Sequence, residues 1–471
     1  MQNEIVEKRR SAMNKKKFVI SFALMAMLLT NVGCTLEQEE NSSHDTDLQT
    51  KELSAYMREV QEQVYQSPMD KAEIIDSEHK LEEQENEQQD TASDESQVIY
   101  VEVEQEAPKE AYEVKQIFST KVPSDILKNL KYDKYPINYD YLLLTGITVN
   151  IRREPTTESA ILKNVPQYQR YTLHKEVIGQ YSNLFQTDSW YKISWEEDDG
   201  IRYGYVISGL AQVRQFQFDK MYRELIKIKR EIDGHQTAYI RNFRNAIGEA
   251  PLYNGTKNDK YGTRWFQSAP AYVRPDVESE FRYIEDGTLL KVVDKQEDFY
   301  KIRTLNFEGE YWVPKKYLSF NNTIKELSKI VIVDRKNQNQ VAFEYEKDKW
   351  HMVSYTLATT GTRGYYQLET SLGYYMAIET VPRFLFLNHA TKQIAGYAPY
   401  AVRFNGGTYI HGVPVSYKVT EDKRIDPGMQ EYIASIGTIP LSSRCVRNYT
   451  SHAKFLYDWT EIGKMAIIVI E

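Results

Sequence analysis

A histidine and a cysteine near the C-terminus are the residues whose types suggest covalent chemistry. His411 is followed by a glycine, and Cys445 lies 34 residues later in the segment 442–448. A free thiol has a pKa of about 8.5, and its thiolate is the reactive form. A histidine within hydrogen-bond reach can take the proton. The chain has 2 cysteines, and the other is N-terminal, so Cys445 is the candidate nucleophile and His411 its candidate base. The alternative for a lone cysteine in a β-rich domain is an inert, small apolar side chain.

The elements that must position this pair are mostly strands. Apolar and alternating runs predict strands at 330–334, 341–345, 352–357 and 465–470. The last of these, 465–470, is expected to be a central strand of its sheet. The segment 451–459 predicts a helix, with Ala453, Leu456 and Trp459 on one face. Ser451 is its expected N-cap.

A weak internal repeat precedes this region. Each copy shows an Arg-Pro or Arg-Glu-Pro turn, an aromatic-Lys-Ile strand and an aromatic-Val strand, at 148–155, 190–193 and 204–206, and again at 271–275, 299–303 and 311–313. The pattern resembles bacterial SH3-like domains. Between the copies, 218–230 has helical spacing and predicts a linker helix that faces a core.

The N-terminal residues are typical of an export signal. Three lysines at 15–17 precede an apolar run over 18–29, which leads to Cys34. That run is shorter than the roughly 20 residues that a membrane-spanning helix needs. The pattern resembles a bacterial lipoprotein signal over 1–34, in which Cys34 is lipidated and anchors the chain outside the cell membrane, facing the wall. An ordinary cleaved signal and an uncleaved anchor are the alternatives, and Met13 is an alternative start.

Charge and composition separate a tether from the folded part. Residues 35–96 contain 19 acidic and 4 basic residues, a net charge of −15, whereas the whole chain carries −8. Such a segment cannot bury enough apolar surface to fold, so we expect an extended, disordered tether over 35–115. A mean hydropathy of −0.59 with 36 tyrosines suits surface-exposed β modules. The absence of a basic stripe argues against nucleic-acid binding. Without a metal-ligand motif or a phosphate loop, we expect neither a metal nor a cofactor.

The C-terminal region resembles the L,D-transpeptidase catalytic domain of the YkuD type. That family has an Ile-His-Gly strand end, a Ser-His-Gly-Cys-hydrophobic-Arg segment and a following helix with Leu-Tyr-Asp-Trp. The matching residues here are 410–412, 445–448 and 456–459. The resemblance implies a mainly β fold, with two SH3-like barrels before a β-sandwich that has a short helix after the nucleophile. The expected domains, after the signal and the tether, are 140–215, a helical linker at 216–250, 262–322, and the catalytic domain at 325–471.

The resemblance also implies a reaction on peptidoglycan. Cys445 would attack the third residue of a stem tetrapeptide, release D-alanine and hold the stem as a thioester. An amine of a second stem would then form a 3-3 cross-link. The family's site roles fall on Gly412, whose carbonyl orients His411, on the backbone N–H groups of Arg444 and Cys445 as an oxyanion hole, and on Arg447, Ser443 and Tyr409 as substrate-binding candidates. Carbapenem-type β-lactams are expected covalent inhibitors.

Three positions depart from the family pattern. Ser443 and Arg444 replace the histidine and glycine before the cysteine, and Ser371 replaces a proline. The 34-residue separation between His411 and Cys445 is long and indicates a loop insertion at 417–434. Unlike glycine, Arg444 is expected to restrict the backbone conformations available before Cys445. Its charge is also expected to favour the thiolate of Cys445.

Three other functions stay open on the sequence. The chain fits a non-enzymatic wall-binding lipoprotein with a degenerate catalytic domain, and Ser443 and Arg444 favour this reading. The same site with water as acceptor would be an L,D-carboxypeptidase. An NlpC-type cysteine hydrolase has its cysteine before its histidine, the reverse of the order here. His389 or His452 is a further candidate to replace the missing histidine in space.

Overall fold

The computed structural model describes residues 112–471, except 365–366, 389–390, 392 and 421–422. The predicted signal with Cys34, most of the predicted tether, and His389 lie outside the described residues. The described part is mainly β, with two α-helices, as the sequence predicted. None of its helices is both long and apolar enough to cross a membrane.

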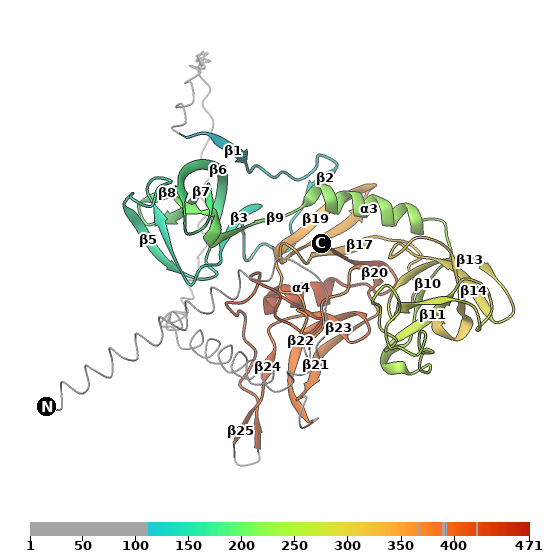
Figure 1. The fold of residues 1–471 in the computed structure, drawn as a ribbon. Coiled ribbons are helices and arrows are strands. Elements are labelled where there is room, and N and C mark those ends of the chain that lie inside the picture. The colour runs from blue at the N-terminus through green and yellow to red at the C-terminus, as the bar shows by residue number, and fades with distance from the viewer. Residues whose placement is uncertain (1–111, 365–366, 389–390, 392, 421–422) are drawn as a thin grey trace, which may run out of the picture. The chain divides into compact units, whose positions relative to one another are not determined.

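The first sheet, cyan to green in Figure 1, has eight strands. They are β1 (Val114–Ile117), β3 (Asp140–Leu144), β4 (Thr148–Arg152), β5 (Ile161–Pro166), β6 (Arg170–Ser182), β7 (Thr187–Glu197), β8 (Gly200–Ile207) and β9 (Ala211–Gln215). Their spatial order is β5-β4-β8-β7-β6-β3-β9, and β1 pairs with β6. Strand β1 thus overlaps the last residues of the range 35–115 assigned to the tether.

The second sheet has seven strands. They are β10 (Thr237–Ile240), β11 (Ser268–Tyr272), β12 (Phe281–Glu285), β13 (Leu289–Lys295), β14 (Phe299–Arg303), β15 (Tyr311–Pro314) and β16 (Leu318–Ser319). Their order is β12-β11-β15-β14-β13-β10-β16, which matches the order of seven strands in the first sheet, whose eighth strand, β1, has no counterpart. The repeat in the sequence is thus a repeat of topology. The SH3-like assignment of both copies stays a prediction.

The turn after the first strand of each repeat shows the same correspondence in atomic detail. The N–H of Glu154 donates to the hydroxyl of Ser159 over 2.9 Å, and the N–H of Arg274 donates to that of Ser279 over 3.2 Å. Each turn has a proline directly after its first residue. Proline fixes φ near −65° and so favours the turn, while the serine satisfies a backbone donor that the turn leaves unpaired.

The C-terminal region contains two more large sheets. One consists of β2 (Ile126–Lys128), β17 (Lys329–Asp334), β18 (Asn339–Glu346), β19 (Lys349–Leu357), β20 (Gly373–Met376) and β28 (Met465–Ile470). Its order is β2-β19-β18-β17-β28-β20, so the final strand is central, as predicted. The other consists of β21 (Glu379–Leu387), β22 (Ile394–Asn405), β23 (Thr408–His411), β24 (Val415–Ser416) and β27 (Val446–Arg447). Helix α4 spans Thr450–Trp459.

The apolar core between these two sheets follows from alternation along the strands. Val331 and Val333 of β17 belong to a core cluster with Ile410 of β23 and Val446 of β27. The α4 residues predicted to share a face, Ala453, Leu456 and Trp459, are all buried. Successive strand residues point to opposite faces of a sheet, so the neighbouring residues of β17 face away from this core.

Helix α3 (Phe218–Ile232) covers that other face, and Figure 1 shows it lying along the sheet. Its residues Met221, Leu225 and Ile228 are fully buried, in one cluster with Ile330 and Ile332 of β17. The core-facing linker helix is thus confirmed. The segment between the two repeats is part of the C-terminal core rather than a free connection.

Truncating this helix face should destabilise the C-terminal sandwich. We expect Leu225→Ala to lower the free energy of unfolding by about 2–5 kcal/mol, because it removes buried methyl groups and leaves a cavity. Chemical denaturation followed by tryptophan fluorescence measures this. The control is Arg230→Ala on the exposed side of α3, with an expected change within about 0.5 kcal/mol. Equal effects of the two variants would show that α3 does not pack as described.

The predicted insertion between His411 and Cys445 has some structure of its own. It contains a two-stranded hairpin of β25 (Lys418–Thr420) and β26 (Lys423–Ile425), which no sequence pattern indicated. The expected N-cap of α4 was wrong by two residues. The cap is Tyr449, without a side-chain capping bond, and the hydroxyl of Ser451 contacts Glu431 instead.

Candidate active site

Two neighbouring parallel strands bring the histidine and the cysteine segments together. Strand β23 pairs with β27 so that Ile410 lies opposite Val446 and His411 opposite Arg447. Both Ile410 and Val446 point into the sandwich core. Because side chains alternate between faces, the residues that flank them point to the other face. His411, Tyr409, Arg447 and the residue before β27, Cys445, therefore share one face of this sheet.

The imidazole of His411 is held by the next residue in the chain. Its Nδ1 lies 2.6 Å from the carbonyl oxygen of Gly412, the contact that the family resemblance implied. A carbonyl can only accept, so Nδ1 carries the proton and Nε2 has a free lone pair. The glycine fits closely, because a Cβ there would lie 3.0 Å from both Pro399 and Thr450. The ring is thus oriented as a base that acts through Nε2.

Burial keeps this imidazole neutral. His411 is only 4% exposed, and burial lowers its pKa to about 4. The nearby cation Arg447 contributes to this lowered pKa, while the hydrogen bond to Gly412 opposes the shift. At neutral pH the ring is therefore unprotonated, which is the state that a general base needs.

The thiol of Cys445 lies in an apolar environment. It packs with Ala401 and Tyr409, and Phe384 of β21 borders the same cluster. The Phe384 ring stacks on that of Tyr409 at 4.2 Å between centroids and lies 6.5 Å from the ring of His411. Phe384 thus borders the cluster that contains Cys445 and lies near His411. No sequence motif pointed to it, because it comes from a distant hairpin.

The same burial keeps the cysteine protonated. It raises the pKa of the Cys445 thiol, and a backbone hydrogen bond at Tyr409 and the cations Arg447 and Arg444 only partly oppose it. The expectation that Arg444 would favour the thiolate is correct in sign, but desolvation outweighs it. Chemically, a neutral thiol and a neutral imidazole on one face of a sheet can pass the thiol proton to the ring nitrogen if the sulfur attacks a carbonyl.

Arg444 adopts a backbone conformation that suits glycine. Its φ is +69°, in the left-handed region, which costs a residue with a Cβ about 1–2 kcal/mol. Its N–H donates to the carbonyl of Leu368 over 2.7 Å, and its carbonyl accepts from the hydroxyl of Thr370 over 2.7 Å. The assignment of the Arg444 N–H to an oxyanion hole is therefore corrected, since that donor is already used. The N–H of Cys445 remains the candidate.

The remaining predicted residues differ in how close they lie to this pair. Tyr409 is 4% exposed and packs against Cys445. Arg447 is half-buried, and its charge acts on both His411 and Cys445. Ser443 is exposed two residues before the thiol. The substrate-binding roles of all three stay predictions.

His452 does not replace the family's missing histidine. It is 1% exposed on α4, with Nε2 3.1 Å from the hydroxyl of Ser354 and Nδ1 within 3.3 Å of the side-chain amides of Gln340 and Asn448. Burial lowers its pKa to about 3. The backbone N–H of Asn448 in turn donates to the carbonyl of His411 over 2.8 Å. This buried group supports the strand end that holds His411.

A comparison with protein families assigns the C-terminal domain. Residues 328–469 match the YkuD family, described as the L,D-transpeptidase catalytic domain. These residues form a YkuD-type domain. Its limits agree with β17 at the start and β28 at the end. A search of curated proteins finds no match to the chain.

Solved structures that resemble the chain include L,D-transpeptidases. One from Mycobacterium smegmatis has 16% sequence identity and a TM-score of 0.24, and the match covers 39% of this chain and 82% of that one. Another L,D-transpeptidase, in complex with imipenem, has 15% sequence identity and a TM-score of 0.24, and the match covers 39% of this chain and 90% of that one.

A further similar structure is a fused Zn-dependent amidase/peptidase/peptidoglycan-binding protein from Clostridium acetobutylicum. It has 17% identity and a TM-score of 0.21, and the match covers 30% of this chain but only 51% of the length of that chain. The family match, rather than these structural similarities, supports the assignment of the YkuD-type domain.

Proposed function

We propose that this chain is a cell-wall L,D-transpeptidase that forms 3-3 cross-links between peptidoglycan stems. The observation that carries the proposal is the shared face of β23 and β27. It places His411, oriented by Gly412 and neutral at pH 7, on the same side of the sheet as the buried thiol of Cys445. The YkuD match supplies the reaction class.

The proposed reaction has two halves. In the first, Sγ of Cys445 attacks the carbonyl carbon of the third stem residue, and its proton passes to Nε2 of His411. The imidazolium then protonates the departing amine of D-alanine, which leaves a thioester on the enzyme. In the second half, the side-chain amine of another stem attacks the thioester and gives its proton to Nε2. The thiol takes a proton back from His411 as the new amide forms.

The charges around the site suit these steps. The thiol and the imidazole are both neutral at rest, so no buried ion has to be maintained before the substrate arrives. The proton moves only as charge develops in the transition state. Arg447 lies opposite His411 in the register and is placed to stabilise a developing negative charge or a stem carboxylate. The N–H of Cys445 is the proposed oxyanion donor.

The cellular setting forms part of the same proposal. An N-terminal lipid on Cys34 would anchor the chain outside the cell membrane, and the acidic segment would extend the folded part toward the wall. The two repeated sheets would act as SH3-like wall-binding or spacing modules. A carbapenem would acylate Cys445, as suggested by the family and by the imipenem complex of a similar structure.

Product masses test the proposed reaction. We would incubate the purified full-length chain with disaccharide-tetrapeptide, using stems with either common third residue, and record the masses formed. A dimer that has lost one D-alanine supports transpeptidation. A monomer shortened by D-alanine would favour an L,D-carboxypeptidase that uses the same site. Unchanged substrate would contradict catalysis.

One observation favours the non-enzymatic alternative. Arg444 occupies a glycine position in a strained conformation, and its N–H is already bonded to Leu368. A wall-binding protein with a disabled site would show such a change. The masses separate the two functions, because a binding protein retains peptidoglycan affinity without altering the stem.

The pKa of His411 predicts the acid limit of activity. Since this pKa is about 4, the base stays unprotonated down to weakly acidic pH, and protonation removes it below that value. We expect kcat/KM to be insensitive to His411 titration from pH 7 to 5 and to fall about tenfold per pH unit below about 4. D-alanine release across pH 3–8, within the range where the protein stays folded, measures this. A loss of activity centred near 6.5 would contradict a buried neutral base.

A further inference from the structure

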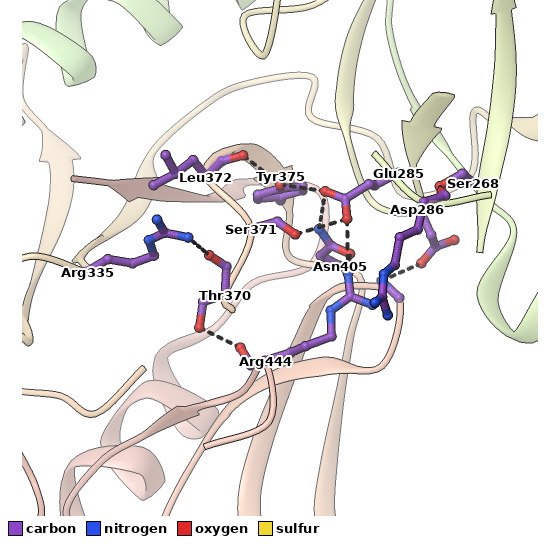
Figure 2. A network of polar contacts seen from close by, with 12 residues as sticks. Ser268, Glu285, Asp286, Arg335, Thr370, Ser371, Leu372, Tyr375, Asn405 and Arg444 are labelled. Carbon is purple, nitrogen blue, oxygen red and sulfur yellow. Dashed lines mark hydrogen bonds and ion pairs between the residues drawn. The ribbon is translucent and has the colours of Figure 1, made fainter. Parts of the chain in front are cut away.

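A turn of the second sheet lies directly beside the nucleophile segment of the YkuD-type domain. Strand β12 ends at Glu285, and Asp286 and Gly287 follow it. Figure 2 shows Glu285 and Asp286 directed toward side chains of the catalytic domain, among them Asn405 and Arg444. Arg444 is the residue immediately before Cys445. The second sheet thus reaches the chain position that precedes the reactive sulfur.

Both carboxylate oxygens of Glu285 accept hydrogen bonds from the catalytic domain. Oε1 accepts from the guanidinium of Arg444 at 3.0 Å and from the hydroxyl of Ser371 at 2.9 Å. Oε2 accepts from the amide of Asn405 at 3.1 Å and from the hydroxyl of Tyr375 at 3.2 Å. Glu285 and Arg444 are largely buried, with 21% and 16% of their side chains exposed. Charge-assisted bonds between largely buried groups of this kind fix geometry.

The next two residues hold the turn in place. The carboxylate of Asp286, 1% exposed, accepts from the guanidinium of Arg403 at 2.9 Å and from the N–H of Gly406 at 3.0 Å. Gly287 has a φ of +80°, and a Cβ there would lie 1.8 Å from the carbonyl oxygen of Phe404. Only glycine permits so close an approach. The turn is therefore seated against the strand end that leads to β23.

We propose that Glu285 is a positioning residue for Cys445 that acts through Arg444. Two bonds hold the strained backbone of Arg444, one to Leu368 and one from Thr370, and the ion pair with Glu285 holds its side chain. An arginine in a glycine position needs such a partner to stay in this conformation. The second repeated sheet is thus a component of the active site, rather than only a spacer or a wall-binding module.

The inference rests on the proposed function for its kinetic consequence, but not for its structural one. Without the carboxylate, the Arg444 side chain loses its ion pair and retains a 3.2 Å hydrogen bond to Oδ1 of Asn405, so the backbone before Cys445 is held less firmly and can relax. Misplacement of a reacting atom by about 1 Å can reduce turnover by about 100-fold. The same relaxation exposes the thiol and leaves a cation beside it that is no longer neutralised, so Cys445 should react faster with a small alkylating agent.

The experiment compares Glu285→Gln with wild type in the full-length chain. We expect kcat to fall about tenfold or more with KM changed less than about twofold, because the lost interaction orients the nucleophile rather than binding substrate. The rate of alkylation of Cys445 by iodoacetamide, followed by peptide mass spectrometry between pH 6 and 10, should rise about fivefold or more. Glu280→Gln is the matched control, since Glu280 is exposed directly before β12 and forms an ion pair with Lys260, in a turn between β10 and β11.

A double-mutant cycle with Arg444→Gly separates positioning from simple attachment of the sheet. Glycine adopts the left-handed conformation without help, so Glu285→Gln should change neither kcat nor the alkylation profile further in that background. Rescue of this kind supports the proposal. An equal effect of Glu285→Gln in both backgrounds would overturn it, as would no effect on alkylation in the wild-type background.

The two proposals fail in different ways. A chain without turnover on any stem but with the expected alkylation changes would refute the transpeptidase function and leave the positioning role intact. A chain with full turnover in Glu285→Gln would refute the positioning role alone.

Discussion

Cys445→Ala is expected to abolish D-alanine release and dimer formation. The sulfur is the atom that forms the thioester, and alanine offers no nucleophile in its place. Removal of the nucleophile from enzymes with covalent intermediates reduces kcat by factors of 10⁴ or more, so we expect a loss on the order of 10⁴-fold or greater. The measurement is the initial rate of D-alanine release from disaccharide-tetrapeptide by the full-length chain.

The matched control is the same substitution at the other cysteine. Cys34→Ala lies in the predicted signal, and we expect it to leave turnover by the purified chain unchanged. Binding to purified peptidoglycan should be the same in both variants, because neither removes the repeated sheets. Turnover retained by Cys445→Ala would exclude a cysteine mechanism. Turnover absent from wild type, with wall binding intact, would support the non-enzymatic alternative.

Acidification is expected to destabilise the YkuD-type domain well before most carboxylates titrate. His411 and His452 are buried, and burial lowers their pKa values to about 4 and about 3 from an ordinary value of 6.5. At pH values between the ordinary pKa of 6.5 and these lowered pKa values, the histidines of the unfolded chain bind protons, whereas those of the folded chain do not. Folding stability therefore falls as pH drops below about 6.5. With about 1.4 kcal/mol per pKa unit, each histidine contributes a loss of about 3 kcal/mol or more by pH 4.

Denaturant unfolding at pH 7, 6, 5 and 4 measures this loss. His452→Gln should flatten the dependence by about one proton, because glutamine keeps a polar contact near Ser354 without a titrating ring. His235→Gln is the matched control for the substitution itself, since His235 is exposed. An unchanged slope in His452→Gln would mean that this histidine is not held neutral in the core.

Much of the fold followed from the sequence because its signals are local. The apolar runs at 330–334 and 465–470 became central strands, and helical spacing at 218–230 became the buried face of α3. Two copies of one strand pattern became two sheets with the same order. Other features depend on distant partners. β2 joins the C-terminal sheet from before the first repeat, and the hairpin of β25 and β26 lies in a charged insertion.

The sequence predicted those residues of the candidate site that belong to the family motif. His411, Gly412 and Cys445 were expected together, and the structure brings their strands side by side with the ring bonded to Gly412. The use of the Arg444 N–H by Leu368 was not visible, because it depends on a loop some 75 residues away. Phe384 and Glu285 belong to no local motif. The partners of Glu285, such as Ser371 and Arg444, are distant in the sequence and become apparent only in the folded chain.

Covalent capture tests the central claim most directly. A tetrapeptide donor whose third-residue amine is blocked cannot serve as acceptor, so an acyl-enzyme should accumulate during D-alanine release. After an acid quench, peptide mass spectrometry should locate the donor, minus D-alanine, on Cys445 as an adduct that hydroxylamine removes. Release of D-alanine with Cys445 unlabelled and open to alkylation throughout, or with the label on another residue, would contradict the account.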